Sequence, residues 1–225
     1  MLTDDKRIRI IVGHYGSGKS EFSVNYALQL RQETTEKIAL SDLDVVNVYF
    51  RSREQEELLN NNQVYTIHSS INAPTLDLPA LSGEIVVPIK DRSYNYIMDV
   101  GGDSVGAKVL GRYSKMIAEE DYDMLFVING NREKTQSVDE IINYIREIEF
   151  TSNLKVTGLI NNTHLLRDTT VEDIEKGQRL ASQVSNILDL PIKYTSCIEK
   201  IINKLPSSTE GYIIPIKLYM RQQWM

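Results

Sequence analysis

The sequence predicts a three-layer α/β fold, in which a mostly parallel β-sheet carries helices on both faces. Short, β-rich apolar runs recur along the chain, and stretches with helical periodicity separate many of them. Such alternation is typical of a parallel sheet wrapped by helices. The expected strands are residues 8–12, 38–43, 64–67, 85–89, 96–100, 124–128, 156–160 and 192–198.

The chain has 225 residues, of which 41% are hydrophobic, so it can bury a sizeable core. No Gly-, Pro- or Ser-rich linker and no internal repeat divides it. We therefore expect a single domain over residues 1–225.

Two expected helices have a clear apolar stripe. In residues 137–150, the spacing of Ser137 and Glu140 is that of a capping box, and isoleucines recur on one face. A second helix covers residues 170–188, and the following Pro191 ends it. Residues 72–84 form an irregular segment with two prolines, which we interpret as an ordered loop that could carry a function.

Charge and composition exclude several classes of protein. The net charge of −6 and the pI near 5.2 argue against nucleic acid as a main ligand. No signal peptide or membrane-spanning run is present, so we expect a cytoplasmic protein. The lone Cys197 excludes an internal disulfide and is interpreted as a packed thiol. His68 and His164 are interpreted as ordinary strand-end or loop residues.

Residues 13–20, GHYGSGKS, match the P-loop (Walker A) pattern G-x-x-x-x-G-K-[ST]. They follow the first expected strand directly. A helical pattern begins at Ser20 and places Phe22, Tyr26 and Leu30 on one face. A P-loop occupies such a strand-to-helix turn, so the context favours a phosphate cradle over a glycine-rich turn without a ligand.

The residue types in this motif suit a polyphosphate. Glycines let successive backbone N–H groups point at phosphate oxygens, and the helix N-terminus adds the positive end of its dipole. Lys19 is expected to contact the β- and γ-phosphates, and the Ser20 hydroxyl to coordinate Mg²⁺. The expected nucleotide-binding residues are Gly13, Gly16, Ser17, Gly18, Lys19, Ser20, Glu21, Gly102 and Asn162.

Acidic residues after two other strands complete the expected site. Asp99 ends the run YNYIMD and has the position of a Walker-B carboxylate, opposite Ser20. Gly102, three residues later, completes a D-x-x-G motif whose N–H can reach the γ-phosphate. Asp42 and Asp44 follow the second strand at a spacing that lets both reach one magnesium ion and its water.

The expected metal ligands are thus Ser20, Asp42 and Asp99, and the expected catalytic residues are Lys19 and Asp44. Asp103 either orients water or caps the helix that starts near Ser104.

Together these motifs resemble the SIMIBI class of P-loop NTPases, specifically its MinD/ParA-like (CobQ/CobB/MinD/ParA nucleotide-binding) branch. The resemblance runs over most of the chain, and DLDVVNVYFRSRE and DVGGDSVGAKVLGRY look like segments of small bacterial ATP-binding proteins. It implies a sheet of seven or eight strands with the nucleotide at their carboxyl ends. It also implies that Asp44 positions or activates the attacking water and that Asp42 lies near the metal.

One position departs from that branch. Its P-loop often reads K-G-G-x-G-K-[ST], and the first lysine reaches the partner's nucleotide across a dimer. His14 stands at that position here, and Tyr15 replaces the first paired glycine. The lysine that would act across a dimer is therefore absent, which argues against dimer-driven hydrolysis. A homodimer remains one of the possible oligomeric states. Candidate sources of a replacement positive charge, each equally suited to a surface or structural role, are Arg51, Lys108 and Arg112.

The expected base is adenine. GTPases of related folds read guanine with the Asp of [NT]-K-x-D, and the matching segment GLINNTHL has no Asp at that place. By the resemblance, Asn162 contacts adenine, with Asn161 as second choice; a loop asparagine without that role is the alternative. The expected ligands are ATP and Mg²⁺.

Three functions fit these motifs. A Mg-ATP-dependent switch or slow ATP hydrolase that acts on a partner uses every motif. An ATP-dependent ligase or kinase acting on a small acceptor is the second, although the sequence has neither an Arg-dense lid nor a glutaminase domain. A membrane- or DNA-associated positioning protein is the third; it rests on Lys217, Arg221 and Trp224, whereas Pro215 favours a docked terminal segment.

Overall fold

A computed structural model describes residues 1–44, 55–68, 83–102 and 104–220 of the chain. Within these residues, eight strands form one sheet in the order β3-β2-β4-β1-β5-β6-β7-β8, and every neighbouring pair is parallel. The strands are β1 (Ile8–Val12), β2 (Lys37–Leu43), β3 (Val64–His68), β4 (Tyr94–Val100), β5 (Tyr122–Ile128), β6 (Gly158–Asn161), β7 (Ile192–Ile198) and β8 (Tyr212–Ile216).

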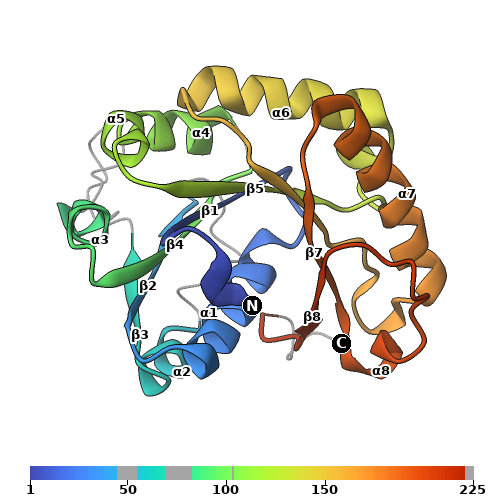
Figure 1. The fold of residues 1–225 in the computed structure, drawn as a ribbon, viewed down its shortest axis with the longest axis horizontal. Helices are drawn as coiled ribbons and strands as arrows, with labels where there is room; N and C mark the ends of the chain where they lie inside the picture. The colour runs from blue at the N-terminus through green and yellow to red at the C-terminus, as the bar shows by residue number, and fades with distance from the viewer. Residues whose placement is uncertain (45–54, 69–82, 103, 221–225) are drawn as a thin grey trace, which may run out of the picture.

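Helices cover both faces of the sheet, which confirms the expected three layers (Figure 1). The helices are α1 (Lys19–Glu33), α2 (Glu56–Asn61), α3 (Val86–Lys90), α4 (Ser104–Gly111), α5 (Ser114–Ala118), α6 (Val138–Ser152), α7 (Val171–Leu188) and α8 (Glu199–Ile202). Short 3₁₀ helices are Leu2–Asp4, Gly83–Ile85, Glu133–Thr135 and Leu166–Asp168. In Figure 1, α4, α5 and α6 lie on one side of the sheet, and α1 and α2 lie on the other.

Each face of the sheet has its own apolar core. Helices α4 to α7 pack on one face over Phe126 and Met98, and helices α1 and α2 pack on the other over Ile11 and Val127. The apolar face expected for α1 is confirmed, because Phe22, Tyr26 and Leu30 are fully buried. Burial of such faces, rather than helix propensity, supplies most of the stability of these helices.

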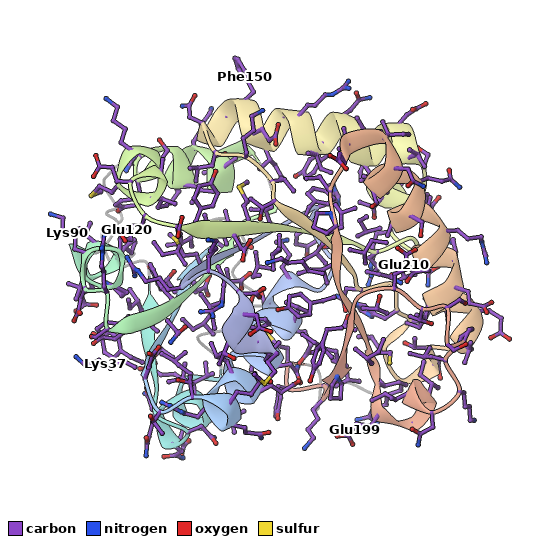
Figure 2. All side chains as sticks on the ribbon, in the orientation of Figure 1. Lys37, Lys90, Glu120, Phe150, Glu199 and Glu210 are labelled. Atoms are coloured by element: carbon purple, nitrogen blue, oxygen red, sulfur yellow. The ribbon has the colours of Figure 1, made fainter. Side chains whose placement is uncertain are left out.

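Helix α6 follows its sequence pattern closely. Ser137 Oγ accepts the N–H of Glu140, and the Glu140 carboxylate accepts the N–H of Ser137 in return, so the predicted capping box is confirmed. The isoleucine stripe is buried against the sheet. Figure 2 shows Phe150 projecting outward from the same helix, where it is 86% exposed.

The expected strand at residues 85–89 is wrong, because this segment is helical. Ile85 and Ile89 are buried whereas Val87 is 52% exposed, and a spacing of four is that of a helix face. A run of five apolar residues fits a strand and a buried helical turn equally well.

Strand β8 was not expected from the sequence, since it contains Pro215. A proline removes a backbone donor, and β8 tolerates it because it is an edge strand that pairs only with β7 among the described strands. Cys197 is buried in β7 as expected, and burial raises the pKa of its thiol to about 11. None of the described helices combines the length and apolar character needed to cross a membrane.

Helix α7 crosses strand β6 at a point of very close approach. A Cβ at Gly177 would lie 2.1 Å from both Asn161 Oδ1 and Thr163 Oγ1. The Asn161 amide is fully buried there; it donates to the carbonyl of Ile174 at 3.0 Å and accepts the N–H of Thr163 at 3.2 Å. Gly177 therefore fixes the distance between α7 and the end of β6.

We expect Gly177→Ala to lower the free energy of unfolding by about 1–3 kcal/mol, because the methyl group would force α7 away from β6. Urea denaturation followed by circular dichroism measures this change. Gly83→Ala is the matched control, since a Cβ there has no described neighbour within 4 Å. Equal stability of the two variants would contradict the close packing.

Candidate functional site

Residues 13–18 join β1 to α1 and form a tight loop at the carboxyl ends of the strands. The N–H of Ser17 donates to the carbonyl of His14 at 3.1 Å, which closes the loop. Gly16 and Gly18 have φ values of 75° and 88°, a left-handed conformation that glycine adopts without strain. Gly18 is also the N-cap of α1, so the first N–H groups of this helix open onto the loop.

Two other loops hold this P-loop in place. From the loop after β6, Asn162 Nδ2 donates to the Ser17 carbonyl at 2.8 Å, and Ser196 Oγ donates to Asn162 Oδ1. A Cβ at Gly18 would lie 2.4 Å from Asn162 Nδ2 and 2.8 Å from His164 Nε2. From the loop after β5, Arg132 Nε donates to the Gly16 carbonyl at 3.0 Å. The P-loop is therefore pre-organised by its surroundings.

The D-x-x-G segment packs directly on the P-loop and its lysine. A Cβ at Gly102 would lie 2.7 Å from Lys19 Nζ and 2.5 Å from the Tyr15 nitrogen. Lys19 is 7% exposed, and its Nζ donates to the His14 carbonyl at 3.1 Å. A glycine at position 102 is thus required for this close approach.

Tyr144 on α6 connects the same two segments. Its hydroxyl donates to the Gly102 carbonyl at 2.7 Å, and its ring makes an edge contact with the ring of His14, with centroids 5.5 Å apart. The P-loop, the D-x-x-G segment and α6 therefore meet at one point.

Two carboxylates lie side by side at the carboxyl edge of the sheet. Asp42 in β2 and Asp99 in β4 are in register and are 2% and 0% exposed, respectively. Burial, followed by the negative charge of Asp42, raises the pKa of the Asp99 carboxyl to about 7; Ser20 and Lys19 oppose this rise. Asp42 Oδ1 also accepts the N–H of Asp44 at 3.0 Å, which sets the direction of the D-x-D segment.

These residues fit a divalent cation. Neither oxygen of Asp99 has a hydrogen-bond partner of normal geometry among the described residues, although Asp99 is fully buried. Mg²⁺ binds through one or two carboxylates and keeps several waters, so Ser20, Asp42 and Asp99 could hold it. In the part of the chain that the structure describes, no cluster of three or more His, Cys, Asp or Glu side chains suggests an all-protein metal site.

A cavity of about 290 Å³ opens above the P-loop. It is lined by Tyr15, Gly16, Gly18, Lys19, Ser20, Glu21, Asp44, Arg132, His164, Leu166 and Met220. The cavity thus joins the P-loop to Asp44 on one side and to the loops after β5 and β6 on the other.

No family model matches the sequence, and no curated protein matches it. Solved structures of the cell division protein FtsY do resemble the fold. FtsY from Thermotoga maritima is 19% identical with a TM-score of 0.56, and FtsY from Mycoplasma mycoides is 22% identical with a TM-score of 0.55. The signal recognition particle receptor FtsY from Elizabethkingia anophelis, in complex with GDP, is 18% identical with a TM-score of 0.51.

The matches cover 85%, 83% and 84% of this chain and 62%, 58% and 56% of those chains, so this chain spans about 60% of their length. The chain has the fold of the P-loop NTPases. At these identities the likeness shows the fold alone.

Some expected site residues have contacts that suggest another task. The Glu21 carboxylate accepts the N–H groups of Tyr219 at 2.6 Å and Met220 at 3.3 Å, so it ties the C-terminal segment to α1. Asn162 uses its carbonyl and one of its amide hydrogens within the protein. Asn161, the second choice for the base, has its amide buried under α7, where it donates to the carbonyl of Ile174.

Two of the three expected sources of positive charge are absent from the lining of the described cavity. Lys108 and Arg112 lie on or just after α4 and are absent from its lining, and Arg51 lies outside the described residues. Asp103 and residues 72–82 also lie outside them, whereas residues 83–84 belong to a 3₁₀ helix.

Sequence reasoning missed three residues that the structure places at the site: Arg132, Tyr144 and the loop residue His164. The segment NGNREKT around Arg132 belongs to no motif with a known spacing. Its position just after the central strand β5 was the one available signal, because ligands of such sheets bind outside the carboxyl ends of the strands.

We expect Asp99→Asn to raise the free energy of unfolding by about 1–3 kcal/mol at pH 8 without Mg²⁺ or nucleotide, because it removes a buried charge that lies beside the charge of Asp42. Urea denaturation in EDTA measures the change. Asp168→Asn, at an exposed carboxylate, is the control and should leave stability unchanged. A less stable Asp99→Asn protein would contradict this reading of the acidic pair.

Proposed function

We propose that this protein binds Mg-ATP and acts as a slow ATPase or nucleotide-dependent switch on a partner. The observation that carries the proposal is the convergence of Lys19, Gly102 and the Asp42–Asp99 pair around one pre-organised P-loop. A switch needs contacts that form with the terminal phosphate and bias a second element. Gly102 can link the two, since its N–H can reach the terminal phosphate and its carbonyl accepts a hydrogen bond from the Tyr144 hydroxyl on α6.

Each residue has a distinct role in the proposal. The N–H groups of the P-loop and of the first turn of α1 bind phosphate oxygens, and Lys19 neutralises their charge. Mg²⁺, held by Ser20, Asp42 and Asp99, would neutralise further charge on the phosphates. Asp44, which lines the cavity and is partly exposed, orients a water and accepts its proton.

The proposal takes adenine as the base. Guanine recognition needs a carboxylate to accept its two N–H donors. The carboxylates that line the described cavity are Glu21 and Asp44, and both Glu21 oxygens already accept backbone N–H groups. Asn162 keeps one amide hydrogen for a ring nitrogen of adenine. The GDP in the FtsY complex makes guanine the alternative to be tested.

An ATP-dependent ligase or kinase is the second candidate. Asp44 is partly exposed in the cavity and could deprotonate the hydroxyl of an acceptor as readily as a water. ADP formation that depends on an added acceptor, rather than on a partner protein, would favour this candidate. The MinD/ParA-like assignment and a cytoplasmic location also belong to the proposal, since they rest on the sequence.

We expect Lys19→Ala to weaken Mg-ATP binding at least about tenfold and up to about a hundredfold, because it removes a charge-assisted hydrogen bond to phosphate. Isothermal titration calorimetry measures the dissociation constant. Lys90→Ala is the control, since Lys90 is an exposed lysine on α3. Unchanged affinity in the Lys19 variant would overturn the proposal.

Titrating the wild-type protein with GTP in the same experiment tests the base. The wild type should bind ATP more tightly than GTP. The Lys19→Ala variant should bind both nucleotides more weakly than the wild type does. Tighter binding of GTP would reject adenine while leaving the P-loop assignment intact.

A further inference from the structure

We propose that Arg132 is a phosphate-binding residue, whose guanidinium contacts the polyphosphate of the bound nucleotide from the loop after β5. This inference rests on the proposed nucleotide binding. Arg132 would then be the second positively charged side chain at the site, beside Lys19, which the sequence motifs identify.

The loop that carries Arg132 is held rigidly. Asn129 is fully buried, and its carbonyl accepts the N–H of Arg132 at 2.9 Å and the hydroxyl of Thr135 at 2.6 Å. The carbonyl of Arg132 accepts the N–H of Thr135 at 3.0 Å. On the other side of the loop, the Asn131 side chain donates a hydrogen bond to Asp173 and accepts one from Lys176, and both of these residues lie on α7. A side chain on such a loop is positioned before the ligand arrives.

The side chain of Arg132 lies across the P-loop. Its Nε donates to the Gly16 carbonyl at 3.0 Å, and its Cδ and Nε would lie 3.8 and 3.7 Å from a Cβ at Gly16. Arg132 also lines the cavity with Lys19 and Ser20. The P-loop carbonyl therefore holds one N–H of the guanidinium and directs the group to the phosphate side of the site.

The terminal nitrogens of this guanidinium are available for a ligand. No described residue accepts a hydrogen bond from Nη1 or Nη2, and no described acid forms an ion pair with Arg132. These nitrogens form a planar fork that matches the oxygens of a phosphate group.

The charge balance of the cavity supports the same conclusion. The acids at the site are Glu21, Asp42, Asp44 and Asp99, whereas the lining residues include one lysine, Lys19, and one arginine, Arg132. A nucleoside triphosphate brings about four negative charges with it, which Mg²⁺ and one lysine do not neutralise. Arg132 supplies the additional positive charge.

The variant Arg132→Gln separates this role from a structural one. The Nε2 of glutamine follows the same number of bonds from the backbone as the Nε of arginine. The variant thus keeps an N–H donor for the Gly16 carbonyl and loses the charged fork. Arg132→Ala loses both, and Lys134→Ala removes an exposed charge from the same loop as a matched control.

Calorimetric titration of Mg-ATP into these proteins, at 50 and 300 mM NaCl, tests the inference. We expect both Arg132 variants to bind about tenfold or more weakly at low salt, and their affinity to depend less on salt than that of the wild type. Lys134→Ala should match the wild type. Thermal unfolding verifies that each variant is folded.

Three results would overturn the inference. If Arg132→Gln binds like the wild type while Arg132→Ala binds weakly, Arg132 only anchors the P-loop. If both bind like the wild type, it does neither. If the wild type does not bind Mg-ATP at all, both the inference and the proposed function fail. In the first two cases the proposed function still stands, provided that the wild type binds Mg-ATP and that Lys19→Ala weakens this binding.

Discussion

Close backbone approach around the P-loop is the constraint on which the rest of the site depends. The loops after β4, β5 and β6 each reach this turn at a glycine: Gly102 lies against Lys19, Arg132 against Gly16, and Asn162 against Gly18. A side chain at Gly18 or Gly102 would separate the segments, whereas Gly16 is needed for its positive φ. Because the segments come from neighbouring parallel strands, the order of the sheet brings them together at its carboxyl edge. The conformation of the P-loop is therefore a property of the whole sheet and not of residues 13–20 alone.

The electrostatics of the site explain why a cation and an anion would bind together. Asp42 and Asp99 are buried side by side, which is costly for two carboxylates and raises the pKa of Asp99. A divalent cation offsets that cost, and a polyphosphate offsets the charges of Lys19 and Arg132. The acids lie at the ends of β2 and β4, and the cations lie on the P-loop and the loop after β5. Charge separation within the site thus matches the charge distribution of a magnesium–nucleotide complex.

Much of the fold and of the candidate site could be predicted from the sequence. The P-loop pattern, the D-x-D acids and the D-x-x-G segment each have a fixed spacing, and each directly follows a strand, so their places at the edge of the sheet follow from the strand order. Residues 85–89 were mistaken for a strand, because five apolar residues carry too little periodicity, and β8 was missed, because Pro215 is tolerated only at an edge. Arg132 and Tyr144 could not be found, because their contacts with Gly16 and Gly102 join segments more than forty residues apart in the chain. Asn162 was expected at the base, and its contact with the Ser17 carbonyl emerged only once β6 and the P-loop were placed together.

Hydrogen exchange of the backbone amides, followed by mass spectrometry with and without Mg-ATP, tests the central claim most directly. The claim is that N–H groups of residues 15–20 bind the phosphates. It predicts that peptides covering these residues and the segment around Gly102 become protected on adding Mg-ATP. Unchanged exchange in the P-loop peptide, or protection confined to another part of the molecule, would contradict it.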